Sequence, residues 1–347
     1  MQRLAPSQLP QVARRGGAAF PYNCSMPTKP AVAPDPFGAP PLPSPVSSTF
    51  RAPVLMATSA VLFALMAIFL RLATQHVSAF EAGFFRSLFG LIFSLPLLIK
   101  PGLRLLRTQH FNLYLMRSLF GTLAMLGSFW SVAHLPLATA VTISYSTPLF
   151  VTVGAVFLLG EIVRARRWSA VAIGFVGVLV VMRPGAVHFS YDMLVALAAA
   201  AIAAGSYISI KFLSRTEPAD AVVIYMGLIM TPLSLIPAVF FWTWPDATGW
   251  VWVVLTGLLG TLGQIFMTRA YQAGDVSALI PINFIQLPIV VAGAWLVFDQ
   301  PLDAGTAVGA AIIIGANIYI TRREARLARR TATDPAIATS ESGQPIG

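Results

Sequence analysis

Long runs of apolar residues, separated by short polar segments, occupy the chain from about residue 52 to residue 321. Most of these runs reach the roughly 20 residues that an α-helix needs to cross a hydrocarbon core about 30 Å thick. The runs are 52–74, 80–99, 111–131, 136–159, 168–182, 192–213, 219–242, 248–268, 276–298 and 303–321. They predict an all-α, polytopic membrane protein with about ten transmembrane helices.

The two ends of the chain lack this pattern. Residues 1–50 hold 11 of the 26 prolines and show little hydrophobic periodicity, a composition that predicts a disordered tail. Two other interpretations are an organellar transit peptide and a start codon assigned too far upstream, with translation beginning near Met26 or Met56. Residues 322–347 form a basic, polar tail.

Composition identifies the solvent of the chain. Hydrophobic residues make up 56% of the 347 residues and charged residues only 10%, against about 25% charged in soluble domains. Because this number of charges is too small to cover a globular surface, we expect the lipid bilayer to surround most of the chain. The single cysteine, Cys24, excludes an internal disulfide and a cysteine-rich metal site.

The formal net charge of +10 would suggest a nucleic-acid partner in a soluble protein. Here the basic residues instead gather in alternate loops, the distribution that orients membrane proteins, so we expect no nucleic-acid binding. With the N-terminus inside, the inner loops carry these cations: Lys100, Arg104, Arg107, Arg164, Arg166, Arg167, Lys211, Arg215 and Arg269. The outer loops carry only Arg183. The asymmetry predicts a multi-pass protein of the cell membrane with both termini cytoplasmic.

Sliding the chain against itself by about 140 residues reveals an internal repeat. The matching pairs are Arg71 with Lys211, Pro148 with Pro288 and, with small gaps, Glu161 with Asp299. They predict two five-helix units, 52–183 and 192–321. Because five is odd, the second unit is inverted, with Glu161 facing the cytoplasm and Asp299 the outside. Inverted repeats are typical of secondary transporters, although membrane helices also resemble one another by composition alone.

The segment 144–181 resembles the second half of an EamA domain, the repeat unit of the drug/metabolite transporter superfamily. It has the Pro within the fourth helix (Pro148), the Gly-Glu at its end (Gly160-Glu161) and a glycine-rich fifth helix (Gly174, Gly177). The segment 287–320 is similar but has Phe298-Asp299 instead of Gly-Glu. The resemblance implies transport of amino acids, drugs, vitamins or nucleoside-like metabolites without ATP. Motif order is similar to that of members that carry riboflavin or S-adenosylmethionine.

Polar residues within the apolar runs predict a substrate cavity, because such groups avoid lipid and face protein or water. Pro148 also removes the amide that would bond the carbonyl of Ser144. The alternative is interhelical hydrogen bonding and a kink, common in membrane bundles. The candidate substrate-binding residues are Tyr145, Ser146, Pro148, Tyr207, Gln264, Asn283, Gln286 and Arg86.

Few charged residues lie within the runs. Arg86 has three interpretations: pairing with Glu81, binding an anionic group of the substrate, or packing within the bundle. Glu81 is the first candidate for a proton carrier if transport is proton-coupled. Glu161 and Asp299 lie at helix C-termini, where the helix dipole opposes them, and are interpreted as gating or structural residues.

Paired glycines on two helices allow close helix approach. Gly174 with Gly177, and Gly305 with Gly309, are explained either by packing within the chain or by the seam of a homodimer.

The sequence contains no HExxH, GxSxG or Walker motif, so we expect no enzyme, no metal and no cofactor. The predicted function is a secondary transporter that moves a small polar organic metabolite (amino-acid, vitamin or nucleoside-like) by alternating access. The alternative is a non-transporting membrane scaffold or receptor.

Overall fold

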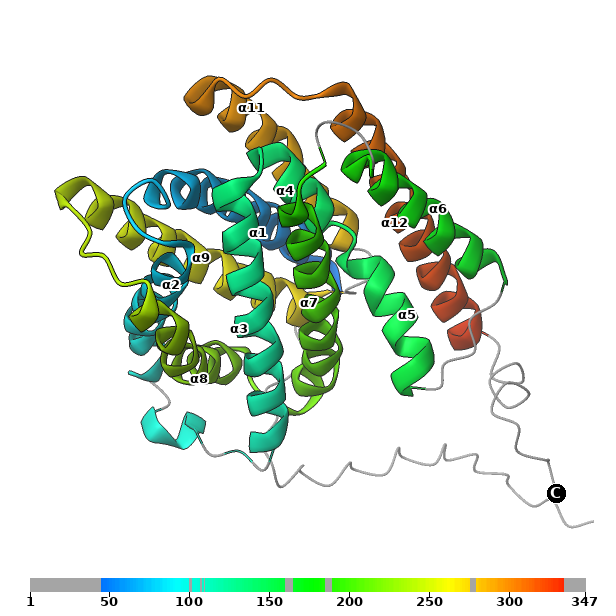
Figure 1. Ribbon diagram of the computed structural model, residues 1–347. Coiled ribbons are helices and arrows are strands. Elements are labelled where there is room, and N and C mark those ends of the chain that lie inside the picture. Colours follow the sequence, from blue (N-terminus) through cyan, green and yellow to red (C-terminus); the bar gives the residue numbers. More distant parts are fainter. Residues whose placement is uncertain are drawn as a thin grey trace, which may run out of the picture. The chain divides into compact units, whose positions relative to one another are not determined.

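The computed structural model describes residues 45–99, 102–106, 108, 110–159, 165–184, 189–274 and 279–333. The predicted gating residue Glu161, residues 1–44 of the predicted disordered tail and the tail beyond residue 333 lie outside this description. Within the described residues all regular structure is helical (Figure 1).

The helices follow the ten apolar runs in order. Their bounds are α1 (Pro45–Ala73), α2 (Ala79–Ser94), η1 (Leu95–Leu98), η2 (Gly102–Leu106), α3 (Phe111–His134), α4 (Leu137–Ser144), α5 (Thr147–Leu159), α6 (Ala165–Met182), α7 (Tyr191–Thr216), α8 (Ala219–Phe240), α9 (Ala247–Ala273), η3 (Ile280–Ile285), α11 (Gln286–Phe298) and α12 (Ala304–Thr333). Eight helical segments of the described chain are long and apolar enough to span a membrane, and Trp168–Met182 is a shorter apolar helix. The prediction of an all-α, polytopic membrane protein is therefore confirmed.

The fourth and ninth runs are each broken, where the sequence suggested one continuous helix. The first break is a turn at Tyr145 and Ser146 between α4 and α5, and the second is the passage from η3 to α11. Pro148 has no amide hydrogen to offer the carbonyl of Ser144, and the Thr147 hydroxyl donates to that carbonyl instead, at 2.8 Å. Proline is well tolerated in the first turn of the helix that restarts there.

The pattern of helix contacts is symmetric between the two halves of the chain. If each of the first five apolar runs is replaced by the corresponding one of the last five, and the reverse, the same pairs of helices are in contact. α1 packs along α9 just as α7 packs along α3, and α1 contacts α11 just as α7 contacts α5. α2 contacts α9 just as α8 contacts α3, and the pairs α2 with α8 and α6 with α12 each map onto themselves. Figure 1 shows α6 and α12 side by side. Every one of these contacts therefore joins the first half of the chain to the second.

Glycines bring α6 and α12 unusually close. A side chain at Gly177 would meet the Gly309 carbonyl at 3.0 Å, and one at Gly309 would meet the Gly177 carbonyl at 2.7 Å. The two backbones thus touch directly, which explains this glycine pair as packing within one chain.

We predict that Gly309→Leu destabilises the protein by about 1–3 kcal/mol or more, the usual cost of overpacking. The backbone of Gly177 cannot move aside as a flexible side chain would. The thermal unfolding midpoint of detergent-purified protein measures the effect. Gly315→Leu on the same helix is the matched control, because nothing lies within 4 Å of its added carbon. Equal midpoints for the two variants would contradict the packing.

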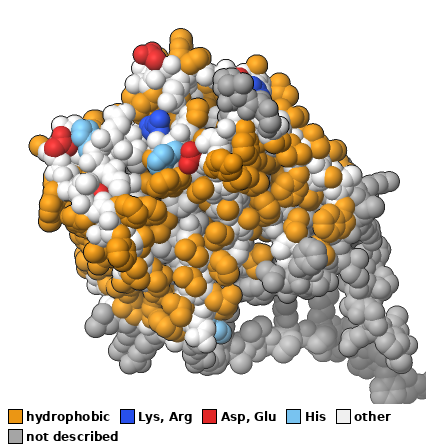
Figure 2. Space-filling view, in the orientation of Figure 1, with side chains coloured by type: hydrophobic (Ala, Val, Ile, Leu, Met, Phe, Trp, Pro, Cys, Tyr) orange, Lys and Arg blue, Asp and Glu red, His pale blue; other side chains and the backbone are white. Residues whose placement is uncertain are grey.

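Charged side chains and hydrophobic surface are separated along the helix axes. The helix ends at residues 74–78, 135–136, 183–184, 241–246 and 299–303 lie at one end of the bundle, which we call the acidic end. Hydrogen bonds and ion pairs join the first of them to 241–246, and the second and third to 299–303. Acidic residues at or near these ends are Glu81, Asp192, Asp246, Asp299 and Asp303. In Figure 2 most charged and histidine side chains lie in the upper part of the molecule, with one histidine at the lower edge, and hydrophobic side chains cover the face between them. This apolar band is the surface that lipid would contact.

Candidate functional site

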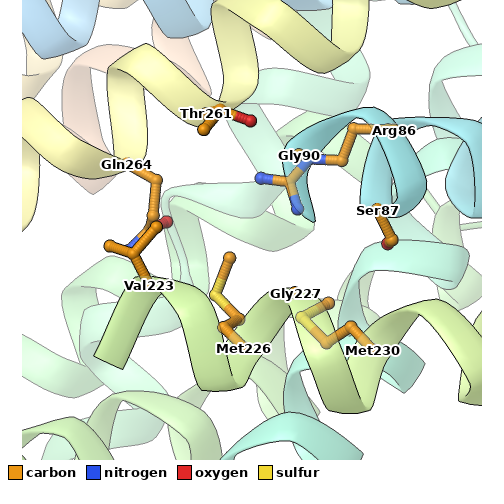
Figure 3. Close-up of a pocket in the computed structure, with 9 residues that line it drawn as sticks. All are labelled: Arg86, Ser87, Gly90, Val223, Met226, Gly227, Met230, Thr261 and Gln264. Atoms are coloured by element: carbon orange, nitrogen blue, oxygen red, sulfur yellow. The ribbon is translucent and has the colours of Figure 1, made fainter. Parts of the chain in front are cut away.

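Helices α2, α8 and α9 line a small, partly open cavity (Figure 3). In this structure the cavity has room for about one water molecule, so a larger solute requires the helices to move apart. Its lining residues are Arg86, Ser87, Gly90, Val223, Met226, Gly227, Met230, Thr261 and Gln264. One wall comes from the first half of the chain and two from the second.

Glycines position the walls of the cavity. Gly227 of α8 lies against the backbone of Leu91 on α2, where an added Cβ would be 3.1 Å from the Leu91 Cα. Gly90 of α2 faces the Thr261 hydroxyl of α9 at the same distance from its added Cβ. Larger residues at these positions would separate the helices or fill the space between them.

Arg86 is the charged residue of the cavity wall. Figure 3 shows its guanidinium extending from α2 into the space between α8 and α9. An added Cβ on Gly260 would lie 3.1 Å from the Arg86 Nε, so this glycine leaves room for the group. Its Nη1 lies 3.7 Å from the Met125 sulfur, a weak acceptor. No carboxylate pairs with Arg86 among the described residues.

Of the predicted substrate-binding residues, the structure places Arg86 and Gln264 in this cavity. The Gln264 amide nitrogen lies 3.4 Å from the Thr268 hydroxyl one turn along α9. Tyr207 of α7 is exposed and does not line the cavity.

The remaining predicted binding residues gather at the two helix breaks rather than in the cavity. Ser146 donates to the Ile143 carbonyl at 2.7 Å, and Pro148 lies in the first turn of α5. The Tyr145 ring meets Phe284 edge to face, 5.1 Å between centroids, and its carbonyl accepts from the Asn317 amide at 2.8 Å. Asn283 lies in η3, and Gln286 begins α11. The Tyr145 hydroxyl and the Asn283 and Asn317 side-chain oxygens are buried without a partner among the described residues.

Glu81 is buried at the N-terminus of α2, where hydrogen bonds hold its carboxylate. It accepts from the Ser78 amide at 3.0 Å in a capping box, and from the amide and hydroxyl of Thr243 at 2.8 and 2.9 Å. The Ser78-x-x-Glu81 spacing is the sequence signal of this structural role. These contacts hold α2 against the segment after α8. Glu81 therefore does not pair with Arg86, one of the interpretations that the sequence suggested.

Asp299 is exposed and ends α11 in a left-handed conformation, with φ of 50°. Its neighbour Gln300 accepts a hydrogen bond from the Leu137 amide at 3.0 Å. Asp303, which the sequence analysis did not single out, forms an ion pair with Arg183 near the start of α12.

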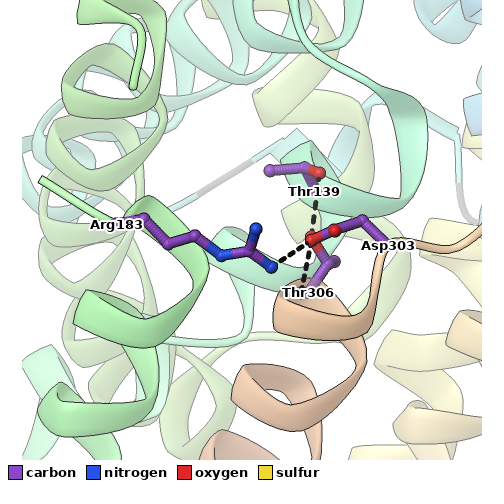
Figure 4. Close-up of polar contacts among 4 residues, drawn as sticks. All are labelled: Thr139, Arg183, Asp303 and Thr306. Carbon is purple, nitrogen blue, oxygen red and sulfur yellow. Dashed lines mark hydrogen bonds and ion pairs between the residues drawn. The ribbon is translucent and has the colours of Figure 1, made fainter. Parts of the chain in front are cut away.

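A polar cluster joins α4, the end of α6 and the start of α12 (Figure 4). Arg183 Nη2 lies 2.5 Å from Asp303 Oδ2, which also accepts from the Thr306 amide at 3.1 Å. The Thr306 hydroxyl lies 3.3 Å from that of Thr139. Thr139 and Arg183 belong to the first half of the chain, and Asp303 and Thr306 to the second.

We predict that this cluster weakens in acid. The Thr306 amide, and then the Arg183 guanidinium, hold the pKa of Asp303 below its usual range. Its stabilising contribution is therefore complete above the ordinary value, about 3.9, and is lost as pH falls through the lowered pKa. Unfolding midpoints measured from pH 6 to pH 3 should show a fall that is smaller for Asp303→Asn, whose amide does not titrate. Parallel profiles for the two proteins would contradict the assignment.

Comparisons with known proteins identify the chain's family. The EamA-like transporter family matches it twice, at residues 51–183 and 191–322. The chain belongs to this family. Among the similar relatives of this EamA-like transporter is the riboflavin transporter of Brucella anthropi, 31% identical over 71% of this chain and 89% of the relative. The S-adenosylmethionine uptake transporter of Rickettsia bellii is 30% identical over 72% of this chain and 86% of the relative.

The pseudopaline exporter of Pseudomonas aeruginosa is also 30% identical, over 75% of this chain and 92% of the relative. A solved crystal structure shares the fold with a TM-score of 0.58 and 21% sequence identity, covering 80% of this chain and 98% of that one. The chain thus spans nearly the full length of its relatives, and family membership confirms the transporter prediction.

Proposed function

We propose that this EamA-like transporter is a secondary transporter that carries a small polar organic metabolite through the cavity of α2, α8 and α9. The observation that carries the proposal is the position of this cavity, which has polar groups and walls from both halves of the chain. Relatives named for riboflavin and S-adenosylmethionine support a vitamin-like or nucleoside-like solute. Relatives named for uptake and for export leave both directions open.

We further propose that the two halves, 52–183 and 192–321, are inverted repeats that move against each other. The symmetric pattern of helix contacts between the two halves supports this, because two similar packings of opposite sense allow access from either side in turn. The cluster of Thr139, Arg183, Asp303 and Thr306 would then hold the acidic end closed.

The proposed orientation places both termini in the cytoplasm and the acidic end outside. It is supported by the distribution of Lys and Arg along the sequence, whose predicted outer loops carry only Arg183. Asp299 lies at the acidic end and would face outward.

A binding screen followed by flux tests the proposal. A thermal-shift screen of metabolites, with riboflavin and S-adenosylmethionine in the panel, selects solutes that stabilise the purified protein. Those solutes should then accumulate in proteoliposomes faster than in protein-free liposomes. A solute that stabilises the protein but does not cross the membrane would favour the alternative, a receptor or scaffold.

A further inference from the structure

Two arginines lie within the helices around the cavity, and neither has a carboxylate partner among the described residues. Arg86 extends into the cavity. Arg117 lies on α3, one turn before Gly121, and an added Cβ on Gly121 would be 3.7 Å from the sulfur of Met230, a cavity-lining residue. Arg117 itself does not line the cavity, but it lies one helical turn from a residue that contacts the cavity wall.

The two positive charges are poorly compensated. Arg117 is only 3% exposed, and its Nε has no hydrogen-bond partner among the described residues. A buried, unpaired charge inside a membrane protein is costly, and such groups commonly mark substrate pathways.

Glu81, the acid nearest to Arg86 in sequence, and Glu217, which contacts α3 through Tyr114, are already engaged elsewhere. Glu81 is bound by Ser78 and Thr243 at the acidic end, and Glu217 by Thr108 and Tyr114 at the opposite end. Neutralisation of the arginines by these groups would require breaking those contacts.

We propose that the cavity recognises an oxyanion, a carboxylate or a phosphate, carried on a small organic solute, with Arg86 as its binding residue and Arg117, one turn from the cavity wall, as a second. The proposal rests on the transport function and names the class of solute. A guanidinium matches the geometry of a carboxylate or phosphate through paired N–H groups. Met226 and Met230 give the opposite wall an adaptable apolar surface, which fits the uncharged body of such a solute.

Benzoate and benzamide test the charge with nearly identical shapes. Their binding to the full-length protein in lipid nanodiscs is measured by calorimetry at constant ionic strength. Benzoate should bind at least about tenfold more tightly, because a hydrogen bond to a charged group adds about 1.5–3 kcal/mol. Phenyl phosphate in a third arm distinguishes a phosphate preference from a carboxylate preference, and tighter binding of either anion than of benzamide supports the proposal.

Variants assign the preference to residues. Arg86→Gln should lose the preference for the anion, whereas Arg269→Gln, which alters an exposed ion pair with Asp220, should keep it. Arg117→Lys retains the charge but not the planar group, so its preference should fall between those of the wild type and Arg86→Gln. Equal or absent binding of all three probes, or an anion preference that survives in Arg86→Gln, would overturn the proposal. An unchanged preference in Arg117→Lys would remove Arg117 from it.

Failure here is distinguishable from failure of the transport function. The binding assay needs no flux, and the flux assay uses solutes selected without regard to charge. A protein that transports a neutral solute but shows no anion preference would sink this inference alone.

Discussion

Joining α4 to α12 by a disulfide between Thr139→Cys and Thr306→Cys is expected to abolish transport. The two hydroxyl oxygens are 3.3 Å apart, so the side chains are well placed for cysteines to bond. If the halves of the chain must separate at the acidic end during each cycle, a covalent link there would hold one state. Oxidised protein in the Cys24→Ser background should show flux no higher than protein-free liposomes.

Reduction of the disulfide and the two single cysteine variants are the controls for this experiment. A reductant should restore the flux of the double variant, and each single cysteine variant should transport in both redox states. Full flux from a protein whose disulfide is confirmed by mass spectrometry would contradict movement at this end.

Filling the cavity should block transport without unfolding the protein. Met226→Trp places an indole into the space beside Arg86, and we expect flux to fall at least about tenfold, a loss that even one misfitting methylene can cause in an apolar pocket. Flux into proteoliposomes is compared with the amount of folded protein recovered by size-exclusion chromatography.

Leu228→Trp is the matched control, two residues further along the same helix. Leu228 is 41% exposed on the apolar surface, where a larger side chain meets lipid rather than the cavity. Similar flux from the two tryptophan variants would show that the cavity is not the path of the solute.

The helices could be predicted because a helix in lipid must bury its own backbone polar groups, which imposes long apolar runs. The breaks at Tyr145 and at Ile285 were harder to predict, because the hydropathy of each run continues across the break. Pro148 gave a local signal, but only the structure shows the Thr147 hydroxyl bonded to the carbonyl that Pro148 leaves without an amide donor.

The site was predicted in part, for a related reason. Arg86 and Gln264 stand out in sequence because polar groups are rare in apolar runs. Met226 and Met230 look like ordinary core residues, and their place in the cavity wall depends on how α8 packs against α2. Thr139 and Thr306 are 167 positions apart, so their contact follows only from the packing of the two halves.

Measuring whether water reaches the cavity tests most directly whether the solute passes between α2, α8 and α9. Met226→Cys and Leu228→Cys are made in the Cys24→Ser background and reconstituted into proteoliposomes. Each variant is exposed to two small thiol reagents of similar size, one charged and one lipid-soluble, and modification is followed by mass spectrometry. We predict that the charged reagent modifies Met226→Cys and stops flux, while Leu228→Cys reacts only with the lipid-soluble reagent. Protection of Met226→Cys from the charged reagent, or modification that leaves flux unchanged, would contradict a water-filled transport path between α2, α8 and α9.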